Sequence, residues 1–210
     1  MEHTTLRQGE RQEHPTGSPP HRQRLHLQDL LQASEHLPST DELRRHLADQ
    51  EVQAHLDSLD RHEILGAYLD SLLTVLHGNE ALHRMMPGLD EVDFNIIRWM
   101  LTPTARARVE GVHDELLYLV TNLRAALDRY RDAPRARELF HTLRAEIGFR
   151  DAWDGTPMQV TYNWPRTTPI RLRMPGIRRP IPLNLEINEF GASSEILIVH
   201  GFYNIPAIAC

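Results

Sequence analysis

The chain has 210 residues, of which 40% are hydrophobic and 25% are charged, and its formal net charge is −6 at pH 7. This balance, without a concentrated basic segment, gives no reason to expect nucleic-acid binding. All 23 basic residues are arginine, which excludes a Walker lysine and a Schiff-base lysine in this sequence, and the single cysteine excludes an internal disulfide and a cysteine zinc site.

The N-terminal residues predict neither export nor a folded element. Residues 1–24 contain a single leucine, three prolines and two glycines, so they cannot bury enough apolar surface to fold, and we expect a disordered tail. They also lack the apolar core of a signal peptide, and no run of 18 apolar residues occurs in the chain. The sequence therefore predicts a cytoplasmic protein without a membrane partner.

The middle of the chain shows helical periodicity. Ser39 and Glu42 have the spacing of a capping box, which predicts the start of a helix that continues to Leu56. Residues 64–76 place apolar side chains at helical spacing, and Gly78 is a typical residue just past a helix end. These patterns predict two successive amphipathic helices.

Two proline signals predict further helices. Thr102-Pro103 is an N-cap followed by proline at the first helical position, and it starts the longest predicted helix, which runs to about Arg131. Ala133-Pro134 begins the last predicted helix, which ends at Gly148. The fold class predicted from these patterns is mainly α, with a compact multi-helix domain over residues 25–150.

Residues 151–210 differ in composition and hold seven of the 14 prolines. Residues 181–187 alternate apolar and polar side chains, which is typical of a half-buried strand, and residues 196–199 form the most apolar and β-prone stretch of the chain. We therefore expect a proline-rich linker followed by one of two structures. The first is a C-terminal β-hairpin packed on the helical domain, and the second is an extended segment that another protein binds.

Three Glu-x-x-His pairs place a carboxylate and an imidazole on one helix face: Glu80/His83, Glu110/His113 and Glu138/His141. If a metal were bound, Glu110, His113, Glu138 and His141 would be the candidates. In an antiparallel helix hairpin, however, the last two pairs would lie roughly 15 Å apart along the axis. We therefore expect no metal site and no cofactor in this chain. We also expect no catalytic residue, because no nucleophile elbow and no phosphate-binding loop is present.

Two short segments resemble known sequences. Asn79-Glu80-Ala81-Leu82, followed by Gly88-Leu89-Asp90-Glu91, resembles a small all-helical family. This family includes the small subunit of extradiol ring-cleavage dioxygenases and the recognition domain of split borosin precursors. The segment Ile196-Leu197-Ile198-Val199-His200-Gly201 is similar to the apolar cores that borosin precursors present for backbone N-methylation.

The resemblance implies a precursor of a ribosomally synthesised, post-translationally modified peptide. Its helical domain would dock a modifying enzyme through Asn79, Glu80, Ala81, Gly88 and Leu89, and the enzyme would modify residues 196–201. The methyl donor, S-adenosylmethionine, would then belong to the partner enzyme. Two alternatives stay open: a helical protein-interaction module with a structural C-terminal hairpin, and a metal-dependent (non-haem iron) enzyme that uses His and Glu.

Overall fold

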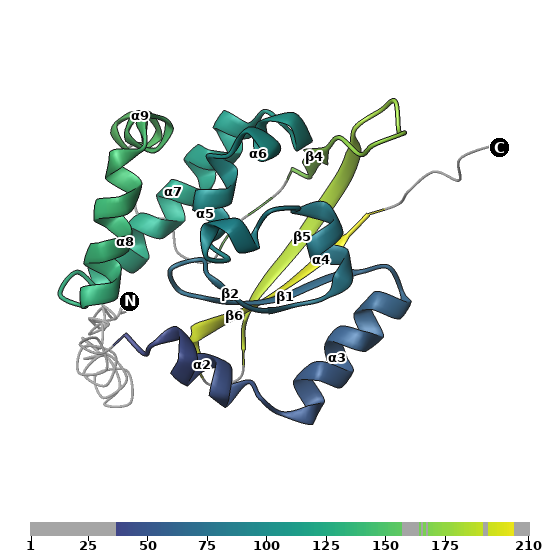
Figure 1. Ribbon diagram of the computed structural model, residues 1–210, viewed down its shortest axis with the longest axis horizontal. Coiled ribbons are helices and arrows are strands. Elements are labelled where there is room, and N and C mark those ends of the chain that lie inside the picture. Colours follow the sequence, from purple (N-terminus) through teal and green to yellow (C-terminus); the bar gives the residue numbers. More distant parts are fainter. Residues whose placement is uncertain (1–36, 157–163, 165, 167, 191–192, 204–210) are drawn as a thin grey trace, which may run out of the picture. The chain divides into compact units, whose positions relative to one another are not determined.

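A computed structural model describes residues 37–156, 164, 166, 168–190 and 193–203. The expected disordered tail, residues 1–24, and Cys210 lie outside these described residues. One sheet of six strands, in the order β2-β1-β6-β5-β4-β3, is the centre of the fold, and every neighbouring pair is antiparallel (Figure 1). The strands are β1 (Leu65–Asp70), β2 (Val75–Gly78), β3 (Val109–Glu110), β4 (Ile170–Leu172), β5 (Ile181–Phe190) and β6 (Ser193–Phe202).

The helices precede, separate and follow the first three strands. They are α2 (Thr40–His46), α3 (Gln50–Arg61), α4 (Glu80–Met85), the short 3-10 helix η2 (Asp90–Val92), α5 (Ile96–Met100), α6 (Pro103–Arg108), α7 (Val112–Arg129), α8 (Pro134–Ala145) and α9 (Ile147–Gly155). None of the helices in the described part of the chain is long and apolar enough to cross a bilayer.

The sheet shows that the mainly α prediction is wrong, and the protein has an α/β fold. The largest error concerns residues 64–76, which were expected to form a helix and instead form β1, a turn and β2. All six residues of β1 are buried, because helices cover both of its faces. A strand buried on both faces has no polar side, so its apolar run resembles one from a buried helix.

Strand β6 pairs on one side with β1 and on the other side with β5. Val199 illustrates this position, since it lies opposite Ala67 of β1 and Ile187 of β5. The backbone groups of β6 are thus paired on both sides, so this apolar strand presents no exposed edge that would promote aggregation.

One face of the sheet is covered by α2 and α3, which pack on Tyr68, Leu76 and Ile196. Gly66 permits this close packing. A Cβ atom at that position would lie 2.5 Å from Leu59 Cδ1 and 3.2 Å from Leu56 Cδ2 of α3. The opposite face packs against α4, α5 and α7, and α8 and α9 pack on α7 (Figure 1).

Helix starts were predicted better than helix lengths. The capping box at Ser39 and the N-cap at Thr102 are confirmed. The helix expected to follow Ser39, however, is divided into α2 and α3, since Asp49 caps a new helix. The longest predicted helix is divided in the same way into α6 and α7, because Gly111 adopts the left-handed conformation (φ 69°) and β3 pairs with β4.

Candidate functional site

An apolar cavity of about 110 Å³ lies between the sheet and the helices on the α4–α7 face. Most of its sheet side consists of every second residue of three neighbouring strands, because alternate side chains of a strand point to the same face. These residues are Leu65, Ala67 and Leu69 of β1, Leu197 and Val199 of β6, and Leu183, Leu185 and Ile187 of β5.

The helix side of the cavity is rich in methionine and aromatic side chains. Met85, Met86 and Met100 line it together with Trp99, whose indole Nε1 donates to the Pro87 carbonyl at 2.9 Å. The indole is therefore satisfied by the protein, and its ring offers an apolar surface. Methionine side chains are flexible and polarisable, so they can adapt to occupants of different shape.

The turn between β1 and β2 forms one end of the cavity. Leu73, at φ 62°, and Ile96 both line it, and the Ile96 amide donates to the Leu73 carbonyl at 2.9 Å. Asn95 holds the turn against α5, since its Nδ2 donates to the Leu72 carbonyl at 2.9 Å while its Oδ1 accepts from the first amides of α5. The cavity wall is thus fixed to a hydrogen-bonded turn.

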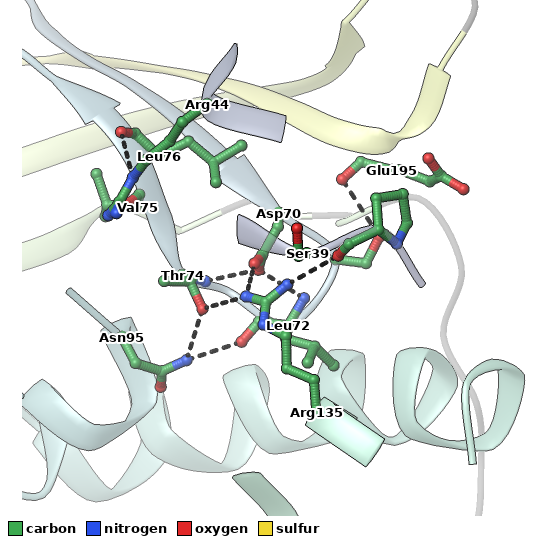
Figure 2. A network of polar contacts seen from close by, with 12 residues as sticks. Ser39, Arg44, Asp70, Leu72, Thr74, Val75, Leu76, Asn95, Arg135 and Glu195 are labelled. Atoms are coloured by element: carbon green, nitrogen blue, oxygen red, sulfur yellow. Dashed lines mark hydrogen bonds and ion pairs between the residues drawn. The ribbon is translucent and has the colours of Figure 1, made fainter. Parts of the chain in front are cut away.

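A buried ion pair connects the same turn to α8 (Figure 2). The Asp70 side chain is completely buried, and it accepts from the Leu72 and Thr74 amides at 2.9 and 2.8 Å and from Arg135 Nη2. Arg135 also donates to the Thr74 hydroxyl at 3.2 Å and to the Pro38 carbonyl at 3.4 Å. The turn is therefore connected to α8 through a buried ion pair and to the segment before α2 through the Pro38 carbonyl.

The few polar side chains of the cavity wall include Glu115, Tyr118 and Arg166. Glu115 and Arg166 form an ion pair in which the side chains are only 15% and 9% exposed. The Arg166 guanidinium lies over the Tyr118 ring, with its Cζ 5.0 Å from the ring centroid. Burial raises the pKa of the Tyr118 phenol, Arg166 opposes this change and Glu115 adds to it.

The segment expected to be modified, residues 196–201, lies in β6 at the centre of the sheet. Ile196, Leu197 and Val199 are buried. Ile198 is partly buried on the sheet face that α2 and α3 cover. His200 points to the α3 face, where its ring lies 5.3 Å from the His55 ring. Gly201 lies between Leu65 and Leu185.

Most of the expected docking residues have contacts within the fold. Asn79 caps α4, and its Oδ1 accepts from the Gly66 and Leu82 amides at 3.0 and 3.1 Å. Ala81 and Leu89 are buried, whereas Glu80 is exposed. Gly88 adopts a left-handed conformation (φ 77°) after Pro87.

The candidate metal ligands do not come together. Glu110 is in β3 and His113 is in α7, so the two do not share a helix face, and Glu138 and His141 are exposed on α8. The Arg171 guanidinium donates to Glu110 at 2.7 Å, and this hydrogen bond holds the pKa of the Glu110 carboxyl below its usual value. Within the described ranges, no group of three or more His, Cys, Asp or Glu is placed to hold a metal ion.

Apart from Leu197 and Val199, the residues that line the cavity were not predicted as site residues from the sequence. Two separate segments line the same cavity: Leu65-x-Ala67-x-Leu69, which lies in a continuous apolar run, and Leu183-x-Leu185-x-Ile187, which alternates with polar residues. Only the second segment was interpreted as a strand.

A comparison with protein families matches residues 48–199 to the model described as "MmyB-like transcription regulator ligand binding domain". A search of curated proteins found no match. The family match contradicts the resemblance to borosin precursors and to dioxygenase small subunits, and with it the hypothesis of a modified peptide precursor and both alternatives to it. The matched range extends from just before α3 into β6 and includes the strands that line the cavity. The chain therefore belongs to the family of MmyB-like transcription regulator ligand-binding domains.

Proposed function

We propose that this chain is the ligand-sensing part of a transcription regulator and that it binds a small, largely apolar molecule in the cavity between the sheet and α4–α7. The observation that carries the proposal is the cavity itself. Aliphatic side chains of β1, β5 and β6 line one side of it, and methionines and Trp99 line the other. An enclosed apolar space with a few polar groups is typical of small-molecule sites.

The proposed signal passes through the turn between β1 and β2. Leu73 and Ile96 line the cavity, and the same turn carries Asp70, which pairs with Arg135 of α8. A ligand that binds one arrangement of this turn better than another shifts the equilibrium between the two arrangements. The position of α8 is then the output of the sensor.

The partner in this proposal is a DNA-binding module or another part of the transcription machinery. The net charge of −6 makes this chain itself a poor ligand for DNA, so we attribute DNA contact to that partner. A role in transcription is also the basis on which we propose a cytoplasmic localisation. No cofactor is part of the proposal, since the small molecule acts as an effector.

Filling the cavity tests the proposed function. Ala67→Met adds side-chain volume at the cavity wall, and Leu123→Met is the matched control, because Leu123 is buried in the same core but does not line the cavity. We expect saturating octane to raise the melting temperature of the wild type and of the control by several degrees but to leave Ala67→Met unchanged. An equal rise in all three proteins would show that octane binds elsewhere.

The regulatory part of the proposal needs a second readout. Chromosomal alleles encoding the two variants are compared by transcript sequencing in the source organism. Ala67→Met is expected to alter the transcripts that deletion of the gene alters, and Leu123→Met is expected to leave them unchanged. Unaltered transcripts in both the deletion strain and the Ala67→Met strain would contradict a regulatory role.

A further inference from the structure

One polar group in the cavity wall has no partner. The Tyr118 hydroxyl is buried and has no hydrogen-bond partner among the described residues. Its ring is held in place by Arg166 on one side and by Trp164, whose ring centroid lies 6.2 Å away. A buried hydroxyl without a partner is unfavourable, and such groups in native proteins call for an explanation.

The two charged side chains beside Tyr118, Glu115 and Arg166, already form an ion pair with each other. Arg166 donates to Glu115 and, through Nε, to the Thr168 carbonyl at 2.9 Å. An anionic head group at this end of the cavity would therefore lie beside the Glu115 carboxylate, and a cationic one would lie beside Arg166. Because both side chains are largely buried, either repulsion would be weakly screened.

Tyr118 can offer a proton to a ligand but does not readily lose it. Burial is the largest influence on the phenol and raises its pKa above the ordinary value of 10.0, so the hydroxyl is protonated at neutral pH. The ligand group that completes this site is accordingly a hydrogen-bond acceptor.

We propose that the ligand of the cavity is an uncharged apolar molecule with one carbonyl acceptor, as in a ketone, an ester or a lactone, and that the Tyr118 hydroxyl donates to this carbonyl. The inference rests on the proposed function, and it adds the chemical class of the ligand. The aliphatic walls bind the hydrocarbon part, while Tyr118 fixes the orientation of the carbonyl and the Glu115–Arg166 pair excludes charged analogues.

Three probes of equal chain length separate the possibilities: 2-octanone, octane and octanoate. Binding is measured from the change in tryptophan fluorescence, since Trp99 and Trp164 line the cavity. We expect 2-octanone to bind the wild type about tenfold more tightly than octane, as one buried hydrogen bond allows, and octanoate to bind more weakly than 2-octanone.

Tyr118→Phe keeps the ring and removes the hydroxyl, so it is expected to abolish the preference for 2-octanone and to leave octane binding unchanged. Tyr130→Phe is the matched control, because Tyr130 is a buried tyrosine that does not line the cavity. In addition, the infrared carbonyl band of ¹³C-labelled 2-octanone is expected to shift to lower frequency in the wild type and in the control, but not in Tyr118→Phe.

Glu115→Gln provides an independent check, because it leaves Arg166 without its carboxylate partner. This variant is expected to bind octanoate more tightly than the wild type does. Equal binding of octane and 2-octanone, or a carbonyl band unaffected by Tyr118→Phe, would overturn the carbonyl proposal while leaving an apolar sensor intact. Tightest binding of octanoate to the wild type would also overturn it. If none of the three probes bound, the proposed function itself would fail.

Discussion

Replacing Arg135 by alanine tests the connection between α8 and the turn that borders the cavity (Figure 2). Arg135 is the charged partner of Asp70, whose side chain has no exposed surface. Without the guanidinium, the Asp70 carboxylate would retain two backbone donors, the Leu72 and Thr74 amides, and its charge would have no counterion in the described structure.

The expected loss of unfolding free energy in Arg135→Ala follows from the burial of Asp70. Breaking a buried ion pair by removing one partner costs about 3–5 kcal/mol. The two remaining amide donors, at 2.9 and 2.8 Å, and the 26% exposure of the Arg135 side chain both reduce the loss, so we expect about 3 kcal/mol of unfolding free energy. Arg144→Ala is the matched control. The side chains of the Arg144–Asp154 pair are 40% and 70% exposed, and such pairs contribute about 0–1 kcal/mol.

Urea unfolding followed by circular dichroism measures both variants. Asp70→Asn, alone and combined with Arg135→Ala, completes a double-mutant cycle, and the loss caused by Arg135→Ala is expected to be much smaller when the charge at position 70 is absent. A loss for Arg135→Ala that is below ~1 kcal/mol, or one that persists unchanged in the Asp70→Asn background, would refute the role of the buried pair.

Two further predictions concern the α3 face of the sheet. Burial, and secondarily the nearby His55, lower the pKa of His200, while Glu186 opposes the change. Near the ordinary pKa of 6.5, the unfolded chain therefore binds more protons than the folded chain. The melting temperature should consequently decrease as the pH is lowered from 8 to 5.5. His200→Gln should reduce this fall, and an equal slope in both proteins would contradict the linkage. Gly66→Ala should cost about 1–3 kcal/mol in urea unfolding, because its Cβ would lie 2.5 Å from Leu59 Cδ1, and an unchanged stability would show that the Leu59 side chain or α3 itself can move away.

Local signals in the sequence correctly identified three helix starts. Ser39, Thr102 and Pro134 each lie where a cap or a first-turn proline was expected, because capping depends on residues within one turn of the helix. Interruptions were not predicted, since the break at Gly111 depends on pairing with β4, a strand much later in the chain. The Met85, Trp99 and Tyr118 side chains were not grouped for the same reason, because only the tertiary fold brings their helices to one cavity.

The two principal errors in the prediction have a common cause. Because residues 65–70 were interpreted as a helix, residues 196–199 had no strand beside them, and a run that is apolar on both faces then appeared to need an external partner. In the structure β1 supplies that neighbour, with Leu69 opposite Leu197 and Ala67 opposite Val199. Leu197 and Val199 also line the cavity, so the apolar surface that suggested an external partner is part of the wall of the proposed binding site. An apolar segment with no partner in sequence-based analysis can therefore indicate a missing neighbouring strand or the wall of an internal cavity, and in this protein residues 196–199 have both.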